Sequence, residues 1–312
     1  MMLRGVWLQQ TDHRTRRASI TPPSCAMIDA MATVPTIELR GGARIARLGF
    51  GVFLVPPPET AQVVSLALGA GYRHIDTAAQ YANEAGVGQA VRASGIDRSQ
   101  LFVTTKCSNP DHGYEQAKAA CHVSLERLDL GPIDLYLIHW PVPSQDLYVD
   151  TWRAFIDLQA EGLVRSIGVS NFQPAHLERL VAETGVTPAV NQVELHPRLQ
   201  QHELRTLHAR LGIITEAWSP LARGGMLGDP VVVAIAERHH KTPAQVVIRW
   251  HLQIGNVVIP KSVTPARIAE NIDVFDFELT AEQLAAIDAL ERGERIGPNP
   301  DTFVTPVTNP QS

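Results

Sequence analysis

Eight short apolar runs, separated by longer segments with helical periodicity, recur along the sequence between residues 48 and 259. The runs are Leu48–Phe53, His74–Asp76, Leu101–Thr105, Ile133–His139, Val164–Val169, Ala189–Val193, Ile213–Ala217 and Val257–Ile259. The helical segments between them include Ala61–Gly69, Tyr114–Leu128, Tyr148–Glu161, Ala175–Ala182, Gln201–Arg210, Val231–Arg238 and Pro265–Val274. Such alternation indicates buried parallel strands joined by helices. Eight strands close naturally into a (β/α)₈ TIM barrel, with a doubly wound sheet as the structural rival.

A β-hairpin is predicted ahead of the first run. Thr36–Leu39 alternates in hydrophobicity, Gly41-Gly42 provides a turn, and Ile45–Leu48 continues on the other side. We expect this hairpin to cap the bottom of the barrel. A barrel of this kind commonly takes about 250 residues, so we interpret residues 35–312 as a single domain that ends in a C-terminal loop.

Residues 1–34 differ from the rest of the chain. This stretch carries Arg4, Arg14, Arg16 and Arg17, and its longest apolar run, Val6–Leu8, is too short for a signal peptide. We expect a disordered leader, or an upstream start with Met27 or Met31 as the true beginning. A basic targeting or docking arm is the alternative.

Composition excludes several classes of protein. The chain is 45% hydrophobic, which excludes wholesale disorder, and its formal net charge of −5 makes a nucleic-acid partner a poor hypothesis. No stretch of 18 apolar residues is present, so no membrane span is expected. Three cysteines (Cys25, Cys107 and Cys121) cannot make a disulfide framework, which favours a reducing cytoplasm.

Polar residues stand at or just past the carboxyl ends of six of the apolar runs. Barrel strands deliver functional groups to a single mouth from these positions. The pattern therefore predicts one polar mouth, formed by Asp76, Lys106, His139, Asn171, Gln192 and Lys261.

Four residues could reduce a carbonyl group together. The phenol of Tyr81 has an ordinary pKa of about 10 and becomes a useful acid when a neighbouring ammonium favours its phenolate. Lys106 could supply that ammonium, and Asp76 could hold Lys106 by a charge-assisted hydrogen bond. A neutral His139 imidazole could point at the carbonyl oxygen. We expect this set to polarise a carbonyl and to protonate its oxygen after a hydride reaches the carbon.

Other interpretations of these residues stay open at this point. Asp76 and Lys106 could be no more than an ion pair that closes the barrel, Tyr81 could be an ordinary half-buried aromatic residue, and His139 could be a core histidine. Lys106 could instead form a Schiff base, as in an aldolase. A barrel that binds a cofactor without catalysis is a third possibility. The remaining histidines lack the spacing of metal ligands, so no metal site is predicted.

From about Thr36 to its end, the chain resembles the aldo-keto reductases, and is most similar to the bacterial branch that includes 2,5-diketogluconate reductases. The matching segments are Gly71–Ala78 through Tyr81, Ile133–Pro141, Ile167–Phe172, Asn191–Pro197 and Ile259–Ser262. The resemblance implies a (β/α)₈ barrel, NADPH as hydride donor and a tetrad of Asp76, Tyr81, Lys106 and His139. Tyr81 would be the general acid, Lys106 its pKa modulator, Asp76 the partner of Lys106, and His139 the group that orients the substrate.

The cofactor needs an anchor other than a glycine-rich turn, because no G-x-G-x-x-G follows a strand. Gly86–Val91 is only a near miss inside a helical pattern. The segment from Lys261 into a helix at Pro265 offers backbone N–H groups for phosphate, and Arg267 adds a guanidinium suited to a 2′-phosphate. Arg267 could equally be an exposed helix residue. The resemblance of this segment favours NADPH over NADH.

The resemblance also implies roles for further residues. Ser170, Asn171 and Gln192 would hold the nicotinamide carboxamide, and Trp218 would stack on its ring. Phe53 and Trp140 would wall the substrate pocket, and the substrates would be small aldehydes, 2-oxoaldehydes such as methylglyoxal, or diketo sugars. We expect a monomer. The remaining cofactor contacts would be Ser219 and Leu221 at the pyrophosphate, Lys261, Ser262, Val263 and Arg267 at the phosphate segment, and Glu270 and Asn271 at the adenine.

Overall fold

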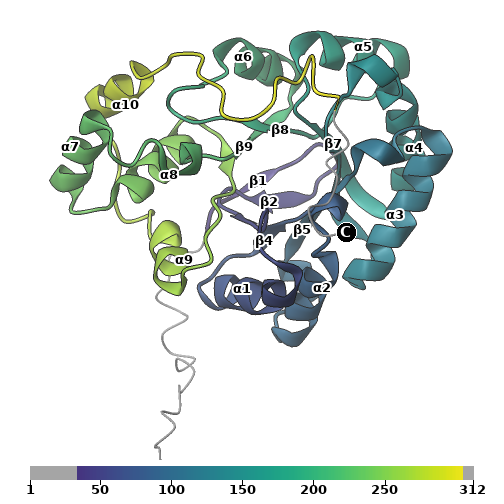
Figure 1. Ribbon diagram of the computed structural model, residues 1–312, viewed down its shortest axis with the longest axis horizontal. Helices are drawn as coiled ribbons and strands as arrows, with labels where there is room; N and C mark the ends of the chain where they lie inside the picture. The colour runs from purple at the N-terminus through teal and green to yellow at the C-terminus, as the bar shows by residue number, and fades with distance from the viewer. Residues whose placement is uncertain (1–33, 305–312) are drawn as a thin grey trace, which may run out of the picture. The chain divides into compact units, whose positions relative to one another are not determined.

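Eight parallel strands form the centre of the structure, a computed structural model that describes residues 34–304 (Figure 1). The short strands follow one another around the sheet in chain order, as the alternating pattern predicts. They are β3 (Phe50–Gly51), β4 (His74–Asp76), β5 (Phe102–Cys107), β6 (Ile133–Ile138), β7 (Val164–Ser170), β8 (Val190–Glu194), β9 (Ile214–Trp218) and β10 (Val257–Val258).

Main-chain hydrogen bonds close the first strand of this sheet against the last. Leu48 forms a parallel bridge with Val258, the Gly49 N–H donates to the Val258 carbonyl over 2.9 Å, and the Val258 N–H donates to the Arg47 carbonyl over 2.9 Å. A doubly wound sheet would leave these two edges apart. The prediction of a (β/α)₈ barrel is confirmed and the open-sheet rival is wrong.

Helices surround the strands (Figure 1). Many begin with a proline in the first turn, where its missing N–H costs no hydrogen bond. All seven predicted helical segments are present, and α2, α8 and α10 are additional to them. The helices are α1 (Pro57–Gly69), α2 (Glu84–Ala93), α3 (Tyr114–Leu128), α4 (Tyr148–Ala160), α5 (Pro174–Thr184), α6 (His202–Leu211), α7 (Pro230–His239), α8 (Pro243–Gln253), α9 (Pro265–Ile272) and α10 (Ala281–Asp288).

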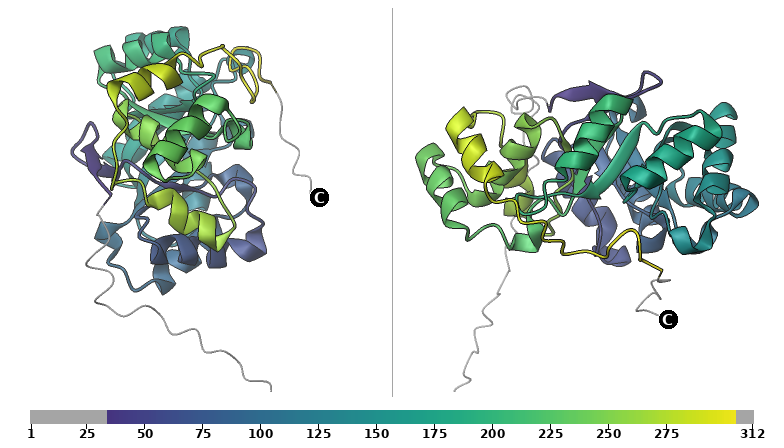
Figure 2. Two further views of the ribbon diagram at one scale, coloured as in Figure 1. Left: turned by 90° about the vertical axis from the view of Figure 1, so that its left-hand side faces the viewer. Right: turned by 90° about the horizontal axis from the view of Figure 1, so that it is seen from above.

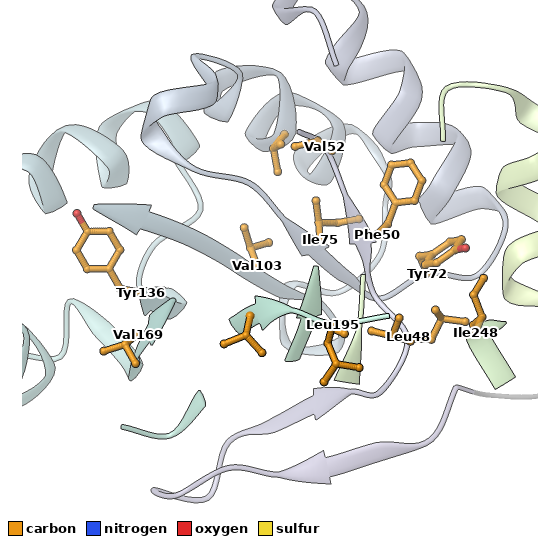
Figure 3. Close-up of a cluster of buried hydrophobic side chains, with 14 of the residues drawn as sticks. Leu48, Phe50, Val52, Tyr72, Ile75, Val103, Tyr136, Val169, Leu195 and Ile248 are labelled. Carbon is orange, nitrogen blue, oxygen red and sulfur yellow. The ribbon is translucent and has the colours of Figure 1, made fainter. Parts of the chain in front are cut away.

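The main apolar core lies between the strands and these helices (Figure 3). Side chains that leave the strands outward, such as Ile75, Val103 and Tyr136, are almost completely buried there. Because successive side chains on a strand point to opposite faces, the residues between them turn into the barrel. The polar residues Asp76, Thr104 and Lys106 stand in these alternate positions and are also buried.

The predicted hairpin forms from β1 (Thr36–Glu38) and β2 (Arg44–Ala46), paired antiparallel. Leu39 and Ile45 bury their side chains in one cluster with Phe102, Val190 and Val257, which lie at or next to the amino ends of barrel strands. Figure 2 shows the hairpin on one side of the barrel and the yellow segment after α10 on the opposite side. The hairpin therefore covers the bottom, and the carboxyl ends of the strands face the other way.

Residues 1–33 lie outside the described part of the chain, and so do residues 305–312. The predicted leader and the final residues of the predicted C-terminal loop fall in these ranges. None of the helices found between residues 34 and 304 is long and apolar enough to cross a bilayer.

Candidate active site

A cavity of about 850 Å³ opens at the carboxyl ends of the strands. Of the residues predicted for the site, only Lys106 is absent from its lining, because Lys106 is completely buried beneath it. Five of the six strand-end residues predicted for one polar mouth therefore line this cavity, and Lys106 departs from that prediction. The predicted residues that line the cavity are Phe53, Asp76, Tyr81, His139, Trp140, Ser170, Asn171, Gln192, Trp218, Ser219, Leu221, Lys261, Ser262, Val263, Arg267, Glu270 and Asn271.

Lys106 and Asp76 form a buried ion pair at the floor of the cavity. The Lys106 Nζ lies 2.7 Å from Asp76 Oδ1 and donates a second hydrogen bond to the Thr77 carbonyl over 2.8 Å. Burial opposes the charge on Lys106, but the neighbouring acidic groups, Asp76 foremost among them, together outweigh burial, so the pKa of Lys106 is raised above its usual value. Lys106 is thus an ammonium fixed in place, with two of its three protons committed to partners.

Tyr81 stands beside this ammonium at the end of the 3₁₀ turn Ala79–Tyr81. The Lys106 Nζ lies 5.2 Å from the centroid of the Tyr81 ring. Burial raises the pKa of Tyr81, and the negative charge of Asp76 raises that pKa further. The positive charge of Lys106 lowers it. Overall, the pKa of Tyr81 lies above its ordinary value. Lys106 lowers this pKa, as predicted, but by less than burial and Asp76 raise it. Tyr81 is therefore a protonated phenol at neutral pH.

His139 follows β6 and faces Tyr81, with ring centroids 5.7 Å apart and an interplanar angle of 71°. Burial lowers the pKa of His139 well below its usual value, and the positive charge of Lys106 lowers it further. The imidazole is accordingly neutral, as expected, and can donate only one hydrogen bond. Tyr81 and His139 together offer two neutral donors beside the cavity, a suitable pair for a carbonyl oxygen.

Ser170, Asn171 and Trp218 form a hydrogen-bonded row along one side of the cavity. The Trp218 Nε1–H donates to Asn171 Oδ1 over 2.9 Å, and Asn171 Nδ2 donates to the His139 carbonyl over 3.0 Å. Asn171 adopts a left-handed φ of 65°, which an asparagine tolerates better than most residues. The Ser170 hydroxyl donates to the Gln192 carbonyl over 2.8 Å. These bonds fix the Trp218 indole against Asn171.

Glu216 is a buried carboxyl group that the sequence-based prediction missed. Gln192 Nε2 donates to Glu216 Oε2 over 3.0 Å and to Asp76 Oδ2 over 2.7 Å, so a single amide bridges two carboxyl groups. Burial raises the pKa of Glu216 to about 8, and the negative charge of Asp76 contributes to the rise. Glu216 lies in the middle of β9, whereas the other polar residues were predicted because they lie at strand ends.

The far end of the cavity has the features of an anion site. The amino terminus of α9 has no side-chain cap, so its first N–H groups remain available. Lys261 and Arg267 are both exposed there, and neither forms an ion pair with another described residue. The Gly86–Val91 near miss lies inside α2, where Gly88 instead makes room for the Leu128 carbonyl. The expectation of a phosphate site at α9 rather than at these glycines therefore fits the structure.

Aromatic side chains enclose the end of the cavity away from α9. The Phe53 ring lies 5.1 Å from the Tyr81 ring, and the Trp140 ring lies 4.5 Å from that of Phe303. Phe303 and Pro298 also line the cavity; they belong to the segment after α10, within the predicted C-terminal loop, and neither was among the predicted site residues. The buried Glu194 anchors this segment by accepting from the N–H groups of Ile296 and Gly297. Among residues 34–304, no group of three His, Cys, Asp or Glu side chains could hold a metal ion.

Comparison with known proteins identifies relatives over most of the chain. Residues 47–292 match the profile of the aldo/keto reductase family. An aldo-keto reductase of Mycolicibacterium smegmatis is 56% identical over 269 residues, which cover 86% of this chain and 98% of that protein. The methylglyoxal reductase DkgA of Escherichia coli is 51% identical over 275 residues, covering 88% and 99% of the two chains.

Solved structures agree with these sequence matches. A crystal structure of a variant of Gox0644 in complex with NADPH superposes with a TM-score of 0.84 at 48% identity. The match covers 87% of this chain and 99% of Gox0644. The structural similarity therefore extends over nearly the whole described barrel, and the resemblance to the bacterial 2,5-diketogluconate reductase-like branch is confirmed.

Proposed function

This chain belongs to the aldo/keto reductase family, and we propose that it uses NADPH to reduce aldehydes and ketones to alcohols. The observation that carries the proposal is the group formed by Tyr81, Lys106, Asp76 and His139 at the floor of the cavity. The family and the NADPH-bound relative support the cofactor, and the name of the Escherichia coli relative supports a carbonyl substrate.

Two neutral donors prepare the carbonyl group in this proposal. His139 donates one hydrogen bond to the carbonyl oxygen and orients the substrate, while the Tyr81 hydroxyl donates another. NADPH, when bound, supplies a hydride to the carbonyl carbon. Tyr81 then gives its proton to the oxygen as negative charge develops there, and Lys106 stabilises the resulting phenolate. Asp76 keeps Lys106 charged and in position.

The residues present fit a bound NADPH. Trp218 offers a flat indole held by Asn171, and the uncapped end of α9 offers N–H groups for phosphate. Ser170, Asn171 and Gln192 would hold the carboxamide of the nicotinamide. The remaining proposed contacts are Ser219 and Leu221 for the pyrophosphate, Lys261, Ser262, Val263 and Arg267 for the 2′-phosphate segment, and Glu270 and Asn271 for the adenine.

Replacement of Arg267 by alanine tests the phosphate assignment. Because a guanidinium makes charge-assisted hydrogen bonds to a phosphate, we expect the KM for NADPH to rise by about tenfold to a hundredfold. NADH lacks the 2′-phosphate, so its KM should change little. Steady-state kinetics with both cofactors measure this difference, with Arg238→Ala, an exposed arginine on α7, as the control. Equal rises for NADPH and NADH would refute the assignment.

The substrates that fit the cavity are small aldehydes, 2-oxoaldehydes such as methylglyoxal, and diketo sugars. Phe53, Trp140 and Phe303 provide apolar walls, and the polar donors lie at one end. Initial rates of carbonyl-dependent NADPH oxidation across these three classes would rank them. The substrate proposal fails if none of the three classes is reduced.

The rival activities suggested by the sequence find less support. Lys106 does not line the cavity, and its raised pKa disfavours the free amine that a Schiff base requires. A barrel that only senses its cofactor would not need the paired Lys106 and Asp76 beside Tyr81.

We further propose that residues 35–312 form one catalytic domain that acts as a monomer in the cytoplasm. Cys107 and Cys121 are buried free thiols, as a reducing compartment would allow. Size-exclusion chromatography with light scattering would test the monomer.

A further inference from the structure

Glu216 lies inside the barrel next to the residues of the cavity floor, but it does not line the cavity. Its side chain points inward from the middle of β9, in register with Gln192 on β8 and Val257 on β10. It is completely buried, and Trp218, two residues further along the strand, lines the cavity. Glu216 is therefore placed behind the reacting groups, and it acts through other residues rather than by touching the substrate.

The charged groups around Glu216 leave it without an ionised partner. The cation that acts on Glu216 among residues 34–304 is Lys106, and it is committed to Asp76 at 2.7 Å. His74 on β4 approaches Glu216 most closely from the other side, with Nε2 3.6 Å from Oε1, but burial and Lys106 lower the pKa of His74 to about 3. Ionised Glu216 would give this buried region one uncompensated negative charge, which is costly. A neutral acid avoids that cost.

Gln192 connects Glu216 to the catalytic set. Its Nε2 carries two hydrogens, and the amide uses them on Glu216 Oε2 and Asp76 Oδ2. Asp76 in turn holds Lys106, which stands beside Tyr81. Five groups, four on different strands and Tyr81 on a 3₁₀ turn, thus form a continuous path from Glu216 to the proposed proton donor.

We propose that Glu216 is a positioning residue that works as a neutral carboxylic acid, holding Gln192 against Asp76, and that its ionisation weakens Tyr81 as a proton donor. The inference rests on the proposed carbonyl reduction. Loss of the Glu216 proton would place a second negative charge next to Asp76. That charge would hold the proton on Lys106 and on Tyr81 more tightly, and a weaker acid protonates the substrate oxygen more slowly.

The pH dependence of the chemical step tests the proposal. In single-turnover reduction of methylglyoxal with NADPH, the wild-type rate should fall by about threefold to tenfold near pH 8, to a lower plateau. A second fall should follow at higher pH as Tyr81 ionises. Glu216→Gln keeps an acceptor for Gln192 but cannot ionise, so it should lose the first fall and keep the second.

A matched control shows whether the loss of the fall near pH 8 is specific to Glu216 or follows the removal of any buried carboxyl group. Glu84 on α2 is equally buried, accepts a hydrogen bond from Thr105 over 2.6 Å and lies outside the cavity lining. Glu84→Gln should keep both falls. Three results would each overturn the proposal. They are a wild-type rate that shows no fall near pH 8, a Glu216→Gln rate that retains this fall, and a Glu84→Gln rate that loses it.

Infrared spectroscopy provides a readout that needs no turnover. The wild-type protein should show the C=O stretch of a protonated carboxylic acid below pH 8, which disappears above it and is missing in Glu216→Gln. Absence of this band would refute the neutral acid even in an active enzyme. If the band is present but no carbonyl compound is reduced, the proposed function fails while the neutral acid stands.

Discussion

Replacement of Tyr81 by phenylalanine should abolish most carbonyl reduction while leaving NADPH binding intact. The substitution removes one oxygen atom and keeps the aromatic ring, which lies 5.1 Å from the ring of Phe53. Proton transfer by a positioned side chain contributes about a hundredfold to ten-thousandfold to rate. We therefore expect kcat to fall by about a thousandfold, with the Kd for NADPH within about twofold of the wild-type value.

Tyr114 on α3 provides the control for this experiment. Its hydroxyl donates to Asp157 on α4, away from the barrel mouth. Tyr114→Phe also removes one phenolic oxygen, so it should leave kcat near the wild-type value. Stopped-flow NADPH oxidation and fluorescence titration of the cofactor measure the two quantities separately. Normal turnover in Tyr81→Phe would rule out Tyr81 as the general acid.

Replacement of Lys106 by methionine should weaken both the fold and the reaction. Breaking a buried ion pair by removing one partner typically costs about 3–5 kcal/mol, because the remaining charge has no compensation. In Lys106→Met that charge is Asp76, which is almost completely buried. We expect the free energy of unfolding at pH 7 to fall by about 3 kcal/mol and kcat to fall by at least about a hundredfold.

The double variant Lys106→Met/Asp76→Asn separates these two effects. Since it removes both charges, it should recover about half of the lost stability without recovering activity. Urea denaturation and single-turnover kinetics measure the two properties. If the double variant is no more stable than Lys106→Met alone, the buried charge is not the cause of the lost stability. Wild-type rates in either variant would exclude Lys106 from the mechanism.

Periodicity predicted the barrel because the strands are short, apolar and regularly spaced. The strand-end rule then gathered side chains from five different strands or their following residues into one mouth, with Lys106 buried beneath it. Such a rule depends only on strand direction. It therefore holds even where the predicted limits are wrong, as for β3, which contains only Phe50 and Gly51 of the predicted run from Leu48 to Phe53.

Features that depend on tertiary packing could not be predicted in the same way. Phe303 contacts Trp140 across more than half the length of the chain, held there by the anchor that Glu194 provides to Ile296. Glu216 lies inside an apolar strand, and only the folded barrel shows its partner Gln192. The net direction of the Tyr81 pKa likewise depends on burial, which a sequence does not quantify.

Carbonyl-dependent oxidation of NADPH by the purified full-length protein tests the central claim most directly. The decrease in NADPH absorbance should be followed with methylglyoxal, a simple aldehyde and a diketo sugar, with and without the protein. The account predicts oxidation that requires both the protein and a carbonyl compound, and an alcohol formed in equal amount. Absence of oxidation with every carbonyl compound, or trapping of the substrate on Lys106 by borohydride, would contradict it.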